Sequence, residues 1–207
     1  VQVTLDKDGI PKYEILENVA WDNIPFTAKT ENLAKITQAV SFGSLAQRNS
    51  VSRETIKKFL RAMPDDSIRV FDINLRQHFY TKDLIHQSLE LANVLKINDE
   101  EVAVVSELYG YNEDNEQDVC KCLLSEYNLD LVILTKGVEG SFVCTSKETS
   151  SQPTPKVHVA DTVGAGDSFT AAFVASSIHG YRIVDAHQLA VEVSAYVCTQ
   201  HGHMPNL

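Results

Sequence analysis

The sequence predicts an α/β fold in which helices cover both faces of a mostly parallel sheet. Short apolar runs alternate along the chain with longer stretches in which apolar residues recur every three or four positions. This alternation is typical of β-α-β units, whose parallel strands are buried on both faces and read as continuous apolar runs. The 207 residues, 43% of them hydrophobic, are enough for one domain with a sizeable core, with or without a small appendage.

The first half of the chain reads as a hairpin followed by strand and helix units. Residues 1–16 alternate apolar and polar side chains around Asp8 and Gly9, which predicts a β-hairpin. Ser52 can cap a helix with an apolar inward face. The apolar runs and spacings predict, in order, helix 30–36, strand 39–42, the helix that Ser52 begins, strand 68–73, helix 84–92, strand 94–97 and helix 100–108.

The second half of the chain ends in two apolar helices. Residues 146–156 are polar and contain two prolines, which predicts a surface loop. A short strand is predicted for residues 156–160, and the helix after it carries Phe169 and Phe173 and ends near Gly180. The other elements predicted here are helix 119–127, strands 131–134 and 141–144, and a final helix over 186–197.

Composition excludes several classes of protein. The net charge is −10, from 18 basic and 28 acidic residues, and no basic cluster offers a site for nucleic acid. No stretch approaches the roughly 20 apolar residues that span a bilayer, and no signal peptide opens the sequence, so no membrane partner is expected. The four cysteines lack the spacing of a disulfide framework or a zinc site, and we expect reduced thiols in a cytoplasmic protein. They are Cys120, Cys122, Cys144 and Cys198.

The clearest chemical signal is the segment DTVGAGDSF at residues 161–169, between a predicted strand and an apolar helix. Gly164 and Gly166 let the backbone turn with its N–H groups aimed at one point, and the helix start adds about 0.5 e of positive charge. These features predict an anion site suited to a phosphoryl group. Asp167 would oppose an anion there, unless it is the base that accepts the proton of an attacking hydroxyl. The alternative is that Asp167 only caps the helix.

A second motif, at the end of strand 68–73, consists of Asp72, Asn74 and Arg76. Asp72 and Asn74 share one face at period two, and the guanidinium of Arg76 can hold phosphate oxygens with two hydrogen bonds. The alternative is that Arg76 pairs with a surface carboxylate.

Two more motifs follow the next predicted strands. Asn98 and Glu101 are three residues apart, and an amide and a carboxylate suit a Mg²⁺ ion that keeps most of its waters. Read alone, Asn98 is a helix cap and Glu101 a solvated charge. Thr135, Gly137 and Gly140 end a strand and turn tightly, which lets a nucleotide approach the backbone but also fits a simple hairpin turn.

These four motifs, in the order in which they occur along the chain, resemble the PfkB (ribokinase-like) family of carbohydrate kinases, and the resemblance covers residues 1–207. It implies a ribokinase-like three-layer α/β/α domain that phosphorylates a sugar hydroxyl with ATP and Mg²⁺. Asp167 would be the catalytic base, the amides of Gly164, Ala165 and Gly166 the anion hole, and Arg76 a further catalytic residue.

The resemblance also implies roles for the remaining residues. Asn74, Arg76 and Asp167 would contact the sugar substrate. The other implied contacts are Asn98, Thr135, Gly137, Gly140, Ala195 and Cys198 with ATP, Glu101 with Mg²⁺ through water, and Asp161, Val163 and Gly202 with K⁺, which some members bind.

The acceptor side of the resemblance is less complete. The segment FGSLA at residues 42–46 resembles fructokinase-type members and favours fructose, although a strand-to-loop turn explains it equally well. Members of the family begin with a sugar-reading Gly-Gly segment and carry a lid through which they often form homodimers. Neither is matched here, so we expect the N-terminal part and most of the lid to be absent, with the hairpin 1–16 near the lid or sheet edge. On its own, this chain is then expected to be inactive.

Three other functions are compatible with parts of the sequence. A non-catalytic nucleotide- or sugar-binding member of the fold is disfavoured because Asp167, Gly164 and Gly166 are all in place. A kinase for another polyol or a nucleoside stays open. A dinucleotide-binding oxidoreductase, suggested by the two glycines, is excluded because Phe169 stands where the third glycine would be.

Overall fold

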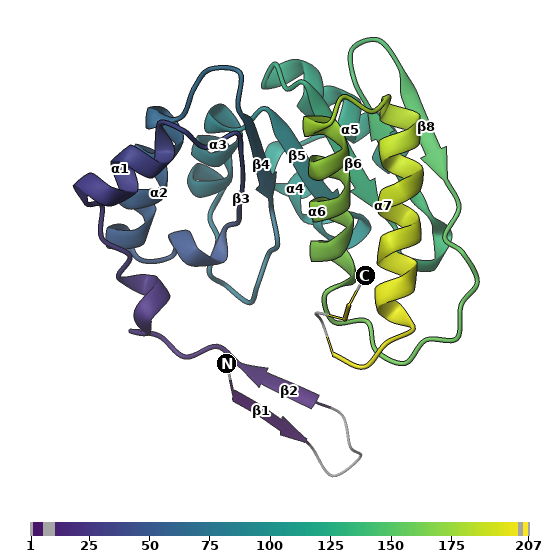
Figure 1. Cartoon of the computed structure of the whole chain (residues 1–207), viewed down its shortest axis with the longest axis horizontal. Helices are drawn as coiled ribbons and strands as arrows, with labels where there is room; N and C mark the ends of the chain where they lie inside the picture. The colour runs from purple at the N-terminus through teal and green to yellow at the C-terminus, as the bar shows by residue number, and fades with distance from the viewer. Residues whose placement is uncertain (1, 6–10, 203–204, 207) are drawn as a thin grey trace.

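The structure is a computed structural model that describes residues 2–5, 11–202 and 205–206. Figure 1 shows a central sheet with helices on both of its faces. The sheet has six strands in the order β3-β4-β5-β6-β7-β8; the pairs from β3 to β6 are parallel, and β7 and β8 are added antiparallel. The predicted layered fold with a mostly parallel sheet is confirmed. The strands are β3 (Ala39–Phe42), β4 (Ile68–Asp72), β5 (Val94–Asn98), β6 (Leu131–Thr135), β7 (Ser141–Cys144) and β8 (Thr149–Gln152).

Two layers of helices cover this sheet. Helices α6 and α7 pack on one face, while α2, α3, α4 and α5 pack on the other and α1 lies against α2 (Figure 1). Within the described ranges, no helix is long and apolar enough to cross a membrane. The helices are α1 (Ala28–Ala34), α2 (Ser50–Ala62), α3 (Lys82–Leu91), α4 (Asp99–Tyr109), α5 (Glu116–Glu126), α6 (Ala165–Ile178), α7 (Ile183–Cys198) and the short 3-10 turns η1 (Ala20–Asp22), η2 (Leu45–Gln47) and η3 (Gly137–Glu139).

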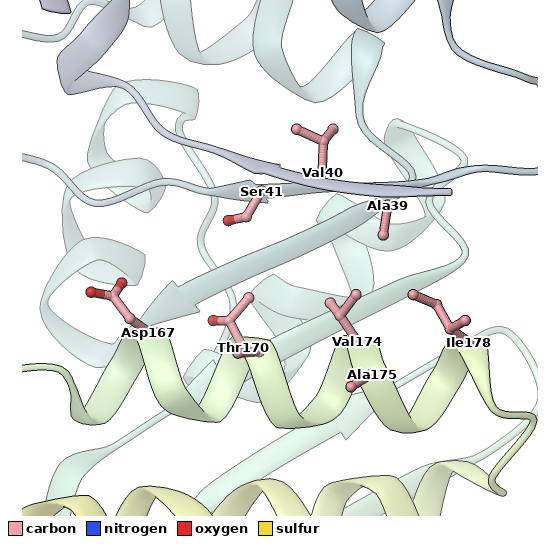
Figure 2. A pocket seen from close by; sticks show the side chains of 9 residues that line it. Ala39, Val40, Ser41, Asp167, Thr170, Val174, Ala175 and Ile178 are labelled. Atoms are coloured by element: carbon pink, nitrogen blue, oxygen red, sulfur yellow. The ribbon is translucent and has the colours of Figure 1, made fainter. Parts of the chain in front are cut away.

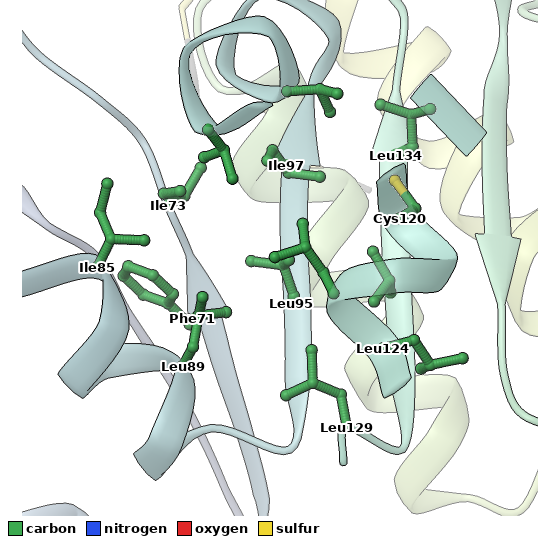
Figure 3. Close-up of a cluster of buried hydrophobic side chains, with 14 of the residues drawn as sticks. Phe71, Ile73, Ile85, Leu89, Leu95, Ile97, Cys120, Leu124, Leu129 and Leu134 are labelled. Atoms are coloured by element: carbon green, nitrogen blue, oxygen red, sulfur yellow. The ribbon is translucent and has the colours of Figure 1, made fainter. Parts of the chain in front are cut away.

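The strands bury side chains on both faces, as their continuous apolar sequences predict. Val70 packs against the α6 and α7 layer, whereas its neighbour Phe71 points into the larger core on the opposite face. Figure 3 shows this larger core, in which Phe71, Leu95 and Leu134 meet side chains of α3 and α5. Each of these fully buried side chains contributes about 1.5–3 kcal/mol to folding. The sheet is therefore a rigid platform for whatever its strand ends carry.

The predicted N-terminal hairpin is present as a separate two-stranded sheet. β1 (Gln2–Leu5) pairs antiparallel with β2 (Pro11–Glu14), and Figure 1 shows the pair set apart from the main layers. The predicted turn at Asp8 and Gly9 lies outside the described residues.

Two predictions for the polar segment before α6 were wrong. The predicted loop 146–156 contains strand β8, which pairs antiparallel with β7. The sequence of β8 shows no alternation of apolar and polar residues, because the one buried side chain of the strand, Ser150, is polar. Its hydroxyl forms a 2.9 Å hydrogen bond with the ring of His187. Conversely, residues 156–160 form no strand. Their backbone is fixed at its end instead, where the amide of Ala160 donates to the carbonyl of Cys198 at 2.8 Å.

The start of α2 also differs from the prediction. Asn49, not Ser52, caps the helix, because its Oδ1 accepts a hydrogen bond from the amide of Val51 at 3.0 Å. Ser52 is buried one turn later and holds the preceding segment, donating to the carbonyl of Trp21 and accepting from the amide of Ile24, each at 2.9 Å.

Candidate active site

The predicted site residues gather at one edge of the sheet. Asp72, Asn98 and Thr135 stand at the carboxyl ends of β4, β5 and β6, which are adjacent parallel strands. The loop that enters α6 ends beside them, because Gly166 in the first turn of α6 lies against Lys96 of β5. Ligands of open α/β sheets bind at this edge.

Gly164 fixes the entry into α6. It is the N-cap residue, with a left-handed backbone (φ 85°) that favours glycine over any other residue. The amide of Ala165 is turned back to the carbonyl of Thr162 at 3.3 Å, so it helps to close the turn. The amides of Gly166 and Asp167 come next, and a helix offers its first amides no acceptor of its own. These two amides are therefore the best placed to bind an anion.

Asp167 is the third residue of α6, with an exposed side chain. It is not the helix cap, because Gly164 holds that position. Within the described part of the chain it forms no ion pair. Figure 2 shows its carboxylate at one end of a groove of about 340 Å³ between β3 and α6, with Ser41 nearby and Ile178 at the far end. The carboxylate is thus available to a ligand.

A second pocket, of about 480 Å³, lies on the other side of the first turn of α6. Its size falls in the range of small-molecule sites. Five of the six residues expected to contact ATP line it, together with Gly166 of α6; the sixth, Asn98, does not. The five are Thr135, Gly137, Gly140, Ala195 and Cys198.

The turn after β6 shapes one wall of this pocket. Gly140 has φ 110°, and a Cβ added there would lie 2.5 Å from the carbonyl oxygen of Gln152, so only glycine fits. Gly137 has φ 50°, but open space surrounds the position of its Cβ. The turn is thus fixed more firmly at Gly140 than at Gly137.

His187 supports the same wall from behind. Its ring nitrogens form hydrogen bonds with the hydroxyls of Ser141 on β7, at 2.7 Å, and Ser150 on β8, at 2.9 Å. Its ring also meets Phe169 of α6 edge-on, with centroids 5.9 Å apart. Burial lowers the pKa of His187 to about 4, so the ring is neutral near pH 7. Sequence reasoning missed this residue, because a lone histidine on a helix carries no positional signal.

Asn98 and Glu101 form a capping box at the start of α4. The Oδ1 of Asn98 accepts from the amide of Glu101 at 2.8 Å, and Oε2 of Glu101 accepts from the amide of Asn98 at 3.0 Å. Oε1 of Glu101 accepts from the amide of Leu75 at 2.9 Å, which ties α4 to the segment after β4. The reading of Asn98 as a helix cap is confirmed, but Glu101 is not a solvated charge: it is 6% exposed, and burial raises its pKa.

The segment after β4 presents Arg76 to solvent. Its guanidinium donates to the carbonyl of Leu75 at 3.0 Å and has no carboxylate partner among the described residues. Asn74 has a left-handed backbone (φ 43°), and its carbonyl accepts from the hydroxyl of Ser44 at 3.2 Å. The alternative reading of Arg76, as half of a surface ion pair, is not what the structure shows.

Metal ligation by protein side chains alone is not supported. In the ranges that the structure describes, no group of three histidine, cysteine or acidic residues could hold an ion. The residues fit a magnesium ion held mainly by phosphate oxygens and water, as is usual for this metal.

The three residues expected at a K⁺ site do lie together. Oδ1 of Asp161 accepts a hydrogen bond from the amide of Val163 at 3.0 Å. The amides of Val163, Gly202 and Thr162 hold the pKa of Asp161 below its ordinary value.

Comparison with known proteins relates this site to one family. The pattern of the pfkB family of carbohydrate kinases matches residues 16–207. A 5-dehydro-2-deoxygluconokinase of Bacillus cereus is 28% identical over 193 residues, which cover 90% of this chain and 58% of the relative. A fructokinase of Escherichia coli is 32% identical over 109 residues, covering 50% of this chain and 34% of the relative.

A solved structure gives the same picture of the fold. An uncharacterized sugar kinase from Pyrococcus horikoshii, crystallised with ATP, superposes with a TM-score of 0.76 at 23% identity, over 97% of this chain and 64% of that one. The ribokinase-like fold is confirmed. The chain spans about half the length of the curated relatives that it matches. With a family match that runs from residue 16 to the last residue, this chain belongs to the pfkB family of carbohydrate kinases.

Proposed function

We propose that the protein to which these residues belong transfers the terminal phosphoryl group of ATP to a hydroxyl group of a sugar. One observation carries the proposal. Consecutive residues at the start of α6 face two different cavities: Gly166 lines the pocket beside the β6 turn, and Asp167 lines the groove beside β3. A nucleotide in the first and an alcohol in the second would meet at the amides between them.

The chemistry follows from this placement. The amides of Gly166 and Asp167 hold the terminal phosphate with the partial positive charge of the helix start. The acceptor oxygen attacks phosphorus, the bond from phosphorus to the bridging oxygen of ADP breaks, and that oxygen keeps the electron pair. Asp167 accepts the proton of the attacking hydroxyl, and its exposed carboxylate forms no ion pair with the residues that the structure describes. Arg76, exposed just after the carboxyl end of β4, braces the phosphates.

The ions take supporting roles in this proposal. When bound, Mg²⁺ would supply positive charge that offsets the negative charge of the phosphates. Glu101 would act on it only through water, because both of its carboxylate oxygens already accept backbone hydrogen bonds. Asp161, Val163 and Gly202 are the residues that we propose for K⁺, on the ground that they lie together at the entry to α6.

The acceptor is proposed as a hexose or a close relative of one. The segment at residues 42–46 favours fructose, but Phe42 stacks on Phe71 with ring centroids 5.3 Å apart, and Ser44 is buried against Asn74. These side chains therefore order the turn more than they face a ligand. A relative that matches 90% of the chain is a 5-dehydro-2-deoxygluconokinase, which makes a keto-sugar acid the second candidate.

The test is a coupled ADP-release assay of the full product of the gene against fructose, 5-dehydro-2-deoxygluconate, ribose and nucleosides. We expect turnover with one of the sugars, and we expect D167N to lower it by about 10²–10⁴-fold. ATP binding, measured on the 207-residue chain by calorimetry, should survive in D167N.

Two results would overturn parts of the proposal. Undiminished turnover in D167N would remove Asp167 from the role of base. ATP binding without turnover of any acceptor on the panel would support the alternative of a non-catalytic binding protein.

A further inference from the structure

Lys96 is a buried cation that the proposed reaction has not yet used. It stands within the apolar strand β5, is 7% exposed, and places its ammonium 2.8 Å from Oδ2 of Asp72, its neighbour in register on β4. An ammonium has three hydrogens to donate. Among the described residues, Asp72 is the one acceptor that Lys96 reaches.

The ammonium lies under the first turn of α6. Val94, two residues before Lys96, packs in the layer formed by α6 and α7, and side chains two apart along a strand share a face. The two residues are close: a Cβ built on Gly166 would lie 3.5 Å from Nζ of Lys96 and 4.0 Å from its Cε. The charge is thus next to the amides that we assign to the terminal phosphate.

Gly166 shows why this proximity matters. Gly164 and Gly140 need glycine for their left-handed backbones, but Gly166 has an ordinary helical conformation. A Cβ there would make only an ordinary van der Waals contact. Neither backbone strain nor crowding explains the glycine. What its missing side chain leaves open is the space between the Lys96 ammonium and the pocket that Gly166 lines.

We propose that Lys96 is an electrostatic positioning residue, whose charge raises the affinity of the Gly166 and Asp167 amides for the terminal phosphate of a nucleotide. The inference rests on the proposed function. Asp72 anchors the ammonium and offsets part of its charge, and the burial of the pair keeps solvent from screening the remainder. A preorganised charge of this kind stabilises an anion at no cost of reorientation.

The experiment compares the binding of ATP, ADP and adenosine to the 207-residue chain by calorimetry. Neutralising Lys96 alone would leave a buried unpaired carboxylate, so the comparison is made in the D72N background. We expect D72N to bind ATP at least as tightly as wild type, and D72N/K96M to bind ATP about tenfold more weakly than D72N. Adenosine binding should be the same in both variants, because it has no phosphate.

A matched control separates charge from stability. Arg48 and Asp22 form another buried ion pair, 2.8 Å apart, and neither residue lines the pocket or the groove. D22N/R48M should lower the free energy of unfolding without changing the ratio of ATP to adenosine affinity. If D72N does not fold, D72N/K96M is compared with wild type, and weaker ATP binding with unchanged adenosine binding is again expected.

The outcomes distinguish a failure of the role proposed for Lys96 from a failure of the proposed function. Equal ATP affinity in D72N and D72N/K96M would overturn the role of Lys96 and leave the proposed function standing. Equal losses for ATP and adenosine would make Lys96 a structural residue only, with the same consequence. A wild-type chain that binds no ATP would contradict both.

Discussion

The two cavities that flank the start of α6 are built very differently. The pocket beside the β6 turn is walled by Gly140, where only glycine fits, and by helices α6 and α7, with hydrogen-bonded His187 supporting the wall from behind. The groove beside β3 is lined by small and aliphatic side chains, with the Asp167 carboxylate at one end (Figure 2). Under the proposed function, this difference means that these residues shape the nucleotide pocket in detail, whereas the acceptor groove offers the proposed base and few polar groups that could recognise one sugar among many.

The largest effect on stability is expected at Gly140. In G140A the added methyl group would lie 2.5 Å from the carbonyl of Gln152 on a left-handed backbone, so the wall of the pocket must move. We expect a loss of about 3 kcal/mol in the free energy of unfolding, and weaker ATP binding. Urea denaturation and calorimetry measure the two.

G137A is the matched control for this prediction. Its backbone is also left-handed, but its methyl group would enter open space, and a loss of about 1 kcal/mol is expected. Equal losses in the two variants would show that the contact with Gln152 does not shape the pocket.

The second prediction concerns His187, behind the wall of the nucleotide pocket, and the dependence of the free energy of unfolding on pH. His187 is neutral in the folded protein down to about pH 4, but an unfolded histidine takes up a proton near pH 6.5. Because the unfolded state binds more protons in this window, stability is complete above pH 6.5 and falls as the pH drops toward 4. Protonation of His187 in the unfolded state should therefore lower the free energy of unfolding by about 2 kcal/mol between pH 7 and pH 5.

The measurement is urea denaturation of wild type and H187Q at both pH values. Glutamine can keep a hydrogen bond to Ser141 or Ser150 and cannot titrate, so the loss between the two pH values should be about 2 kcal/mol smaller in H187Q. Identical pH dependence in the two proteins would contradict the neutral, buried histidine.

The smallest effect on stability is expected in the groove. Ser41 is exposed on the edge strand β3 and lies near Asp167 (Figure 2), so S41A should change the free energy of unfolding by less than about 0.5 kcal/mol. If the acceptor binds there, the KM for the sugar rises in ADP-release assays while ATP affinity is unchanged. A destabilisation as large as that of G140A would erase the proposed contrast between the two cavities.

Much of the fold could be predicted because strands such as Val94–Asn98 and Leu131–Thr135 are buried on both faces and are therefore mostly apolar. β8 escaped prediction for the opposite reason: its buried Ser150 is satisfied by His187, a partner 37 residues away that no local pattern reveals. The cap of α2 was misplaced because Asn49 and Ser52 are both good caps, and tertiary contacts of Ser52 decided between them.

The site shows the same division. Gly164 and Gly140 could be identified from their glycine motifs, and the structure shows a left-handed backbone at both positions. Lys96 was missed, although a single charge inside an apolar strand was a signal, because its meaning depends on Asp72 and Gly166 in other elements. Buried Glu101 likewise depends on another segment, because its Oε1 accepts a hydrogen bond from the amide of Leu75 after β4.

The central claim is that the first amides of α6 hold the terminal phosphate of a nucleotide beside Asp167. The most direct measurement is an NMR titration of the ¹⁵N-labelled chain with ATP and, separately, with adenosine. We predict that the amide signals of Gly166 and Asp167 shift with ATP and stay in place with adenosine, while those of the β6 turn, such as Gly140, shift with both. Signals of Gly166 and Asp167 that ignore saturating ATP would contradict the account.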